Sequence, residues 1–460
     1  NMQKKEYEVE IGGKKMTAIF SDLADQANGS IILKSEDTVV MATAVISKDG
    51  KNNLGFFNLT VDYLEKFYAA GKILGSQFNH REARPSEQAL LAARMTDRTI
   101  RPLFDQRIKN AVQIIITILA VGKADPKTLG VNAASIALHI SDIPWSGPIG
   151  AVHLSKTLEN NNIQINNYVP NENEPVYSLD LLICGKDETI NMIESMAFES
   201  SEEEIGNCFD LAIVEISKWE KFQNQLRKEL GKEKLSFFIP EVSPEVITIF
   251  DEKIKPILDK DLFSKESKKV TEDIELMWKE LMEEKYENGD EQEKNIAEDY
   301  LQDYLDKAFH TKALQEKARA DGRKLDEIRE LYVKAGGVSS MLHGSGIFYR
   351  GETHVLSILT LAGAEAMQKV DGMESSFKRR FMHHYNFPPY SSGETKRVGM
   401  TNRREIGHGF LAEKALIPVL PDKILFPYTI RVVSESVASN GSTSQASICA
   451  LTTALMDGGV

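Results

Sequence analysis

Two kinds of apolar pattern alternate along this chain, and each predicts a different kind of element. From Tyr7 to about Ser47, apolar and polar residues alternate and many are Val, Ile or Thr, which is typical of strands and hairpins. Further along, apolar residues recur at helical spacing in some segments and form short continuous runs in others. We therefore expect helices at 87–95, 132–140 and 200–230, and buried strands at 114–121 and 179–184.

A charged, glycine-poor stretch from Pro244 to about Leu314 has helical periodicity throughout. Its apolar residues form two stripes, at 274–282 and 300–305, and a turn at Asn288-Gly289-Asp290 separates them. Strand patterns return after Gly322. We predict an α/β (α+β) chain of three domains, at 1–238, 239–314 and 315–460, of which the central one is all-helical.

The two strand-rich parts repeat each other. Three landmark pairs keep their order at offsets of 315, 323 and 312 residues: Asp37-Thr38 with Glu352-Thr353, Arg81-Glu82 with Arg404-Glu405, and Ala134-Ser135-Ile136 with Ala446-Ser447-Ile448. Such long offsets indicate duplication of a whole domain. In this alignment the run 439–444 faces 127–132, which lacks its series of hydroxyls. The second copy reaches only 13 residues past Ser447, so we expect it to be truncated.

The run Ser439-Asn440-Gly441-Ser442-Thr443-Ser444 lies between a predicted strand at 428–434 and a predicted helix at 445–456. A helix N-terminus presents unpaired backbone N–H groups and the positive end of the helix dipole, so it favours anions. Three adjacent hydroxyls add donors suited to phosphate. A plain helix cap with surplus serines remains an equal alternative at this level.

Basic clusters in the same part of the chain favour the phosphate site. Arg403 and Arg404 precede Glu405-Ile406-Gly407-His408, and Lys378-Arg379-Arg380 precede a His- and Pro-rich run. Arginine binds phosphate oxygens through two parallel hydrogen bonds. One such cluster alone is more often surface charge. In the first copy, Phe78, Arg81 and Arg84 lie in a loop that either contacts RNA or is a surface turn.

Net charge is −13, which at first argues against a polyanionic ligand. However, the segment 251–306 holds 19 acidic and 9 basic residues, a net charge of −10, which leaves −3 for the rest of the chain. The three cysteines are far apart, and no zinc-ligand spacing occurs. Without a signal peptide or a membrane-length apolar run, we expect a cytoplasmic protein with no membrane contact.

Several motifs together resemble the polynucleotide phosphorylase family. They are HHYNFPPYSSGET at 383–395, NRREIGHG at 402–409, FPYTIRVVSE at 426–435, SNGSTSQAS at 439–447, REARPSE at 81–87 and DRTIRPLF at 97–104. The resemblance covers essentially the whole chain. It implies two RNase PH-like domains joined by an all-helical domain, and a homotrimeric ring with single-stranded RNA in a central channel. Membership of an RNA-degradation complex is a further implication.

The resemblance also implies 3′→5′ phosphorolysis of RNA in mRNA turnover. Inorganic phosphate attacks the terminal phosphodiester and releases a nucleoside diphosphate, in a reversible reaction that commonly uses Mg²⁺. Carried over by motif, Ser442, Thr443 and Ser444 would bind phosphate, while Arg403, Arg404 and His408 would bind the RNA end and stabilise charge. Phe78, Arg81 and Arg84 would contact RNA near the channel.

This chain departs from the family pattern in two places. Family members have an aromatic pair followed by two basic residues where this chain reads Gln77-Phe78-Asn79-His80-Arg81. The resemblance places two catalytic aspartates, a lysine and the Mg²⁺ ligands beyond Val460, so we expect the 460-residue chain to be inactive by itself and to hold no metal site. The alternatives are a non-catalytic RNA-binding ring subunit and a hydrolytic 3′ exonuclease.

Overall fold

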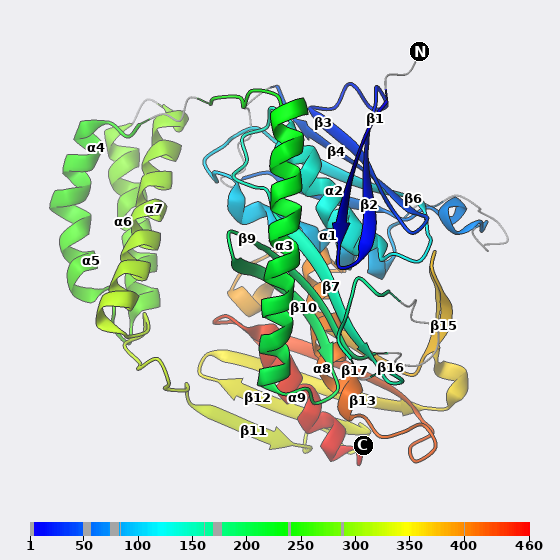
Figure 1. The fold of residues 1–460 in the computed structure, drawn as a ribbon. Helices are drawn as coiled ribbons and strands as arrows, with labels where there is room; N and C mark the ends of the chain where they lie inside the picture. Colours follow the sequence, from blue (N-terminus) through cyan, green and yellow to red (C-terminus); the bar gives the residue numbers. More distant parts are fainter. Residues whose placement is uncertain are drawn as a thin grey trace.

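The computed structural model shows two strand-rich halves with a helical segment beside them (Figure 1). It describes residues 4–48, 57–73, 82, 84–160, 162–168, 177–237, 241–286, 289–399 and 401–460. None of the helices in this described part of the chain combines the length and the apolar composition needed to cross a membrane.

The first half contains two sheets and three long helices. One sheet has the order β1-β2-β3-β4-β6-β5, formed by β1 (Lys5–Ile11), β2 (Lys14–Phe20), β3 (Gly29–Ser35), β4 (Thr38–Ile46), β5 (Leu59–Leu64) and β6 (Val112–Ala120). The other has the order β10-β9-β7-β8, formed by β7 (Gly150–Thr157), β8 (Gln164–Ile165), β9 (Tyr177–Lys186) and β10 (Thr189–Ala197). The helices are α1 (Glu87–Ile100), α2 (Pro126–Ile140) and α3 (Glu202–Leu230).

Helix α2 forms the centre of this half. It packs against β3 and β4 of one sheet and β7 of the other, and nearly every one of its residues is buried. Its small residues allow this burial, because Gly130, Ala133, Ala134 and Ala137 let the backbone approach both sheets closely. A helix that is apolar all round belongs inside a core, and the predicted helix at 132–140 is therefore confirmed, with a start six residues earlier.

The helical segment comprises α4 (Pro244–Ile249), a π-helical turn (Phe250–Ile254), α5 (Lys255–Asp261), α6 (Ser267–Lys285) and α7 (Glu291–Glu316). It has its own apolar cluster, centred on Phe250 and Trp278, and the Trp278 indole N–H donates to the Ala297 carbonyl at 2.9 Å. The predicted boundary at 238/239 lies outside the described residues, and the one at 314/315 falls in the last turn of α7. Both boundaries stay predictions.

The second half has one five-stranded sheet in the order β11-β12-β13-β17-β16. Its strands are β11 (Leu331–Ala335), β12 (Gly344–Arg350), β13 (Thr353–Ala362), β16 (Phe381–Asn386) and β17 (Thr429–Ala438). A hairpin of β14 (Gln368–Asp371) and β15 (Ser376–Arg379) leads into β16. Helices α8 (Arg403–Leu416) and α9 (Thr443–Asp457) pack on this sheet and on each other.

The two halves share one topology. In each sheet, a meander of antiparallel strands lies on one side. The last two strands across the sheet are β6 and then β5 in the first half, and β17 and then β16 in the second, and each of these pairs is parallel. Helix α8 begins 316 residues after α1, and α9 begins 317 residues after α2. The counterpart of the loop at 439–442 is therefore 122–125, directly before α2, and the predicted pairing with 127–132 is wrong because those residues lie inside α2.

One threonine in each half ties the equivalent loop to the sheet. Thr38 donates through its hydroxyl to the Ala124 carbonyl at 2.7 Å and accepts the Gly122 N–H at 2.8 Å. Thr353 donates to the Gly441 carbonyl at 2.9 Å and accepts the Asn440 N–H at 3.0 Å. Both threonines are fully buried at the start of equivalent strands, so the duplicated sequence has kept a duplicated contact.

Replacing Thr353 by Val keeps the side-chain shape and removes both hydrogen bonds to the loop. Because the Asn440 N–H and the Gly441 carbonyl each lose a partner, we expect the free energy of unfolding to fall by about 1–3 kcal/mol. Urea denaturation followed by circular dichroism measures this change. Thr360→Val, at an exposed position of the same strand, is the control, with an expected change within about 0.5 kcal/mol. Equal effects of the two substitutions would contradict the assigned role.

Candidate functional site

The N-terminus of α9 is open. Its N-cap residue Ser442 has a left-handed backbone (φ 51°, ψ 39°), and its side chain makes no capping hydrogen bond. Helices α1, α2, α3 and α8, by contrast, each have an N-cap side chain that accepts a backbone N–H of the first turn. The first turn of α9 therefore offers backbone N–H groups and the positive end of the helix dipole to an anion.

The loop before α9 is held by its carbonyl groups. Arg329 donates to the Asn440 carbonyl at 3.3 Å, and Arg350 donates to the Gly441 carbonyl at 3.1 Å, in addition to the Thr353 bond. Three donors therefore fix the carbonyl groups of this loop. The open N-terminus is thus a preorganised feature of the fold.

The three predicted phosphate-binding hydroxyls do not lie in one environment. Ser442 is exposed, whereas Thr443 and Ser444 are 2% and 7% exposed. The Thr443 hydroxyl accepts a hydrogen bond from the Tyr385 hydroxyl at 2.6 Å, and the Ser444 hydroxyl donates to the Gln445 side-chain oxygen at 3.0 Å. Ser442 is therefore the hydroxyl that a ligand can reach in this structure.

Helix α8 brings basic residues toward the same place. It begins with a capping box, in which Asn402 and Glu405 each accept the other's backbone N–H. Residues four apart share a helix face, so Arg404 and His408 point the same way. The Arg404 guanidinium lies 5.2 Å from the centre of the Phe387 ring, and the His408 ring packs edge-on at 5.1 Å from that of Tyr385. Tyr385 thereby connects His408 to Thr443.

Arg403 has a different environment. It donates to the Val61 carbonyl at 2.8 Å and forms an ion pair with Asp62 at 2.7 Å, both on β5 of the first half. Its side chain is 45% exposed. The structure therefore separates Arg403 from Arg404 and places it at the junction of the two halves.

Two further arginines, Arg94 and Arg98 on α1, lie beside His408. Helix α1 packs against α8, and a Cβ atom built on Gly407 would lie 2.3 Å from the Arg94 Nε. Within the described part of the chain, no carboxylate forms an ion pair with Arg94, Arg98 or Arg404. The sequence analysis missed this pair, because the helix predicted at 87–95 ended before Arg98, whereas α1 continues to Ile100 and places the two arginines four residues apart on one face.

Three guanidinium groups, those of Arg94, Arg98 and Arg404, lie close to His408. Burial and, to a smaller extent, the charges of Arg404, Arg94 and Arg98 together lower the pKa of His408 to about 4. Burial and the charge of Arg98 also lower the pKa of Arg94. The His408 Nδ1 is buried and has no hydrogen-bond partner among the described residues. At neutral pH the cluster thus consists of a neutral imidazole among guanidinium groups.

In the second basic cluster predicted from the sequence, Arg379 and Arg380 make structural contacts within the protein. Arg379 pairs with Glu413 at 3.2 Å and Glu87 at 3.0 Å, and Arg380 donates to the Phe426 and Pro421 carbonyls at 2.7 Å each. The argument that 378–380 adds to a phosphate site is therefore corrected, because partners far away in the sequence bind these two guanidinium groups.

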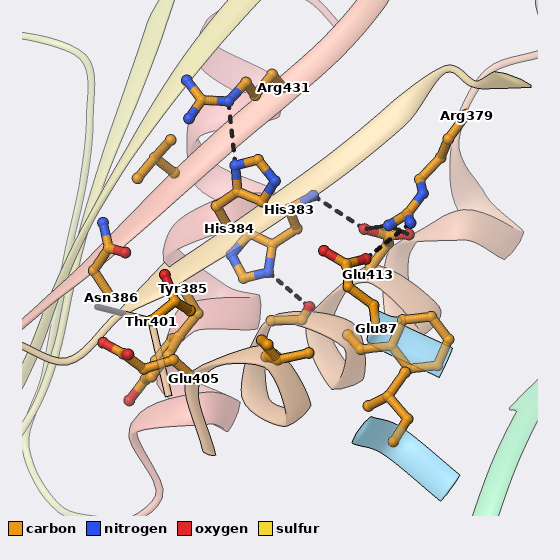
Figure 2. A pocket seen from close by; sticks show the side chains of 15 residues that line it. Glu87, Arg379, His383, His384, Tyr385, Asn386, Thr401, Glu405, Glu413 and Arg431 are labelled. Carbon is orange, nitrogen blue, oxygen red and sulfur yellow. Dashed lines mark hydrogen bonds and ion pairs between the residues drawn. The ribbon is translucent and has the colours of Figure 1, made fainter. Parts of the chain in front are cut away.

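A cavity of about 380 Å³ lies beside α8, bordered by β16, β17 and the first turns of α1 (Figure 2). His383 is one of the residues that line it. Its Nδ1 donates to the Gly409 carbonyl at 2.9 Å, and its Nε2 accepts from the Ser434 hydroxyl at 2.8 Å. Burial lowers the pKa of His383 to about 4, so this neutral ring fastens β16 to α8 and β17.

The predicted RNA-binding residues are only partly within the described chain. Arg84 is exposed just before α1, and Phe78 and Arg81 lie outside the described residues. The described residues contain no group of three or more His, Cys, Asp or Glu side chains arranged to hold a metal ion.

Comparisons with known proteins agree with this duplicated architecture. A profile of the 3′ exoribonuclease family, domain 1, matches the chain twice, at residues 12–144 and 327–460. This double match confirms the predicted fold of two RNase PH-like domains with a helical region between them. The crystal structure of Rrp46 from rice (Oryza sativa) covers 49% of this chain and 94% of its own, at 12% identity and a TM-score of 0.35, which is too weak to add to the assignment.

The similarity to curated proteins also includes residues outside the two segments that the family profile matches. The polyribonucleotide nucleotidyltransferase of Syntrophomonas wolfei is 41% identical over 457 residues, which cover 99% of this chain and 64% of that protein. The one from Halothermothrix orenii is 41% identical over 473 residues, with 99% and 65% covered. The chain thus spans slightly less than two thirds of the length of these relatives. It belongs to the 3′ exoribonuclease family and is similar to polyribonucleotide nucleotidyltransferases along nearly its whole length.

Proposed function

We propose that the chain carries the phosphate- and RNA-end-binding part of a phosphorolytic 3′→5′ exoribonuclease. The observation that carries this proposal is the open N-terminus of α9 beside a cluster of unpaired cations on α8 and α1. An anion bound there receives backbone N–H groups from one side and guanidinium groups from the other. Membership of the 3′ exoribonuclease family and the name of the relatives support RNA as the polymer acted on.

In the proposed reaction, an oxygen of inorganic phosphate attacks the phosphorus of the last phosphodiester. A new P–O–P linkage forms, the P–O3′ bond to the rest of the RNA breaks, and a nucleoside diphosphate leaves. Phosphate is the nucleophile, so the chain needs no nucleophilic side chain. Its residues act by position and charge: Ser442 and the first turn of α9 hold phosphate, while Arg404, Arg94 and Arg98 neutralise the phosphoryl oxygens.

His408 takes part in this scheme as a neutral ring. Its pKa of about 4 keeps the ring neutral at pH 7 before an anion binds, and its Nδ1 is buried and lacks a hydrogen-bond partner among the described residues. Arg403 positions the first turn of α8 through Val61 and Asp62. The chemistry that a divalent metal supplies in such reactions is charge neutralisation at the reacting phosphoryl group.

The path of the RNA is a further part of the proposal. Arg84 lies on the surface before α1, where it can contact the backbone of single-stranded RNA, and we keep Phe78 and Arg81 as proposed contacts beside it. We also infer, from the resemblance, a homotrimer around a central RNA channel. Reversible operation as a nucleotidyltransferase is consistent with the name of the curated relatives.

The first test replaces Ser442 by Asp, which puts a carboxylate at the open helix end, as Asp125 does at α2. We expect the affinity for inorganic phosphate, measured by titration calorimetry, to fall by about tenfold or more, because two anions compete for one helix N-terminus. Ser442→Asn, which is neutral and tolerates the left-handed backbone, is the matched control and should bind nearly as wild type. Unchanged binding by Ser442→Asp would show that phosphate is held elsewhere.

The products from oligoadenylate, phosphate and Mg²⁺ then identify the reaction class. Nucleoside diphosphates support phosphorolysis, and nucleoside monophosphates would overturn it in favour of hydrolysis. Binding of phosphate and RNA without turnover would assign this 460-residue chain the binding role alone.

The second prediction concerns Gly407, where α8 approaches Arg94. Gly407→Ala places a methyl group where the Arg94 Nε now lies, and the flexible guanidinium must move. We expect phosphate and oligoadenylate affinity to fall about threefold to tenfold, while the unfolding midpoint stays the same or rises, because Ala favours helix over Gly. Gly206→Ala in α3, whose added Cβ would meet no atom within 4 Å, shows the helix effect alone. A loss of stability without a loss of affinity would contradict this assignment.

The third prediction concerns protonation of His408. An anion bound beside the ring favours its charged form, so binding raises the pKa of His408 from about 4. By linkage, the affinity for sulfate should then increase as pH falls from 7 to 5. NMR titration of the histidine resonances with and without sulfate measures both effects, and His310, exposed on α7, should not respond to sulfate. A sulfate affinity that is flat with pH would remove His408 from the site.

A further inference from the structure

A short 3₁₀ turn at Pro389–Ser392 follows β16 and carries an exposed tyrosine. This residue, Tyr390, is 61% exposed. Proline begins the turn with a fixed φ, and Gly393 ends it in the left-handed conformation (φ 73°), with its N–H donating to the Tyr390 carbonyl at 3.1 Å. The turn thus presents an aromatic ring to solvent from a constrained backbone.

Hydrogen bonds tie this turn to the loop before α9. The Ser439 N–H donates to the Ser391 carbonyl at 3.0 Å, and the buried Ser391 hydroxyl donates to the Ser436 carbonyl. Ser439 precedes the open N-cap residue Ser442 by three residues. Because three residues of extended chain span at most about 11 Å, the turn that carries Tyr390 lies close to the open helix end.

Tyr390 differs from the two aromatic residues that precede it. Tyr385 is buried, and its hydroxyl donates to that of Thr443. The Phe387 ring is half-buried, and the Arg404 guanidinium lies over it. Both of these rings therefore take part in the internal packing of the site, whereas the exposed ring of Tyr390 is accessible to a ligand.

The first half contains the same turn. A 3₁₀ turn at Phe67–Ala70 follows β5, and its second residue, Tyr68, is 57% exposed. The chain after β6 is bonded to this turn as well, because the Val121 N–H donates to the Ala69 carbonyl at 2.9 Å. In this half, however, the Asp125 side chain caps the helix that follows. Of the two copies, the second combines the exposed tyrosine with an open helix N-terminus.

We propose that the Tyr390 ring stacks on the base of the 3′-terminal nucleotide of RNA, while the reacting phosphoryl groups lie between Ser442 and Arg404. This inference rests on the proposed function and adds a contact to the part of the substrate that the phosphate site does not bind. An aromatic ring stacks on the face of any base, and a tyrosine on a fixed turn loses little conformational entropy on binding. The site therefore requires an unpaired terminal base but discriminates little among the four bases.

Binding of a 5′-labelled oligoadenylate, measured by fluorescence anisotropy without inorganic phosphate, tests this inference. Tyr390→Ser should lower the affinity about tenfold, and Tyr390→Phe should regain most of it, because the ring and not the hydroxyl stacks. The affinity of Tyr390→Ser for inorganic phosphate and its unfolding midpoint should match wild type. Tyr68→Ser is the matched control, since it changes the equivalent turn beside a capped helix, and it should bind oligoadenylate as wild type does.

An oligoadenylate whose 3′-terminal nucleotide lacks its base separates stacking from other contacts. The wild-type chain should bind it about tenfold more weakly than the intact oligonucleotide, and Tyr390→Ser should bind the two equally. If Tyr390→Ser binds intact oligoadenylate as wild type does, or loses the same factor for both oligonucleotides, the inference is wrong and the proposed function stands. A wild-type chain that binds neither phosphate nor oligoadenylate would overturn both.

Discussion

The crossing of α1 and α8 is the contact on which the candidate site depends. It is possible because Gly407 has no side chain where Arg94 passes. Around this point, ion pairs join the halves from three sides: Arg403 with Asp62, Lys414 with Glu194 and Arg379 with Glu87. Neither half alone contains all the cations near His408, since Arg94 and Arg98 come from the first and Arg404 from the second. The cation cluster at the junction is therefore composite, with residues from both halves.

The same helix end has acquired opposite uses in the two copies. In both, a buried threonine ties the loop to the sheet, so the position of the helix is the same. The first copy satisfies the N-terminus of α2 with its own Asp125, and the second leaves that of α9 open. A capped helix N-terminus stabilises the fold, whereas the backbone N–H groups of an uncapped one stay available to bind an anion. Under the proposed function, this difference makes the first copy the scaffold and the second the binding half.

Much of this arrangement could be predicted from the sequence, because it depends on local pattern. The strand at 179–184, the helix at 200–230 and the helix after the hydroxyl run all follow from periodicity, with ends shifted by a few residues. Contacts between distant residues could not be predicted in this way. Arg379 seemed available to phosphate because its partners Glu87 and Glu413 lie 292 and 34 residues away. Short motifs also gave the loop at 439–442 the wrong counterpart in the first half, because similar residues occur at different positions along α2 and α9.

The low pKa values in the cluster are themselves a reason to expect an anion. Burial lowers the pKa values of His408 and Arg94, and the guanidinium groups of Arg98 and Arg404 lower them further, so the cluster opposes additional positive charge. The cluster persists because the α1–α8 packing and the Tyr385–Thr443 bond hold it from both sides. Under the proposed function, an anion at the first turn of α9 offsets the repulsion among these guanidinium groups. The binding energy is thus set by the fold in advance, as electrostatic preorganisation requires.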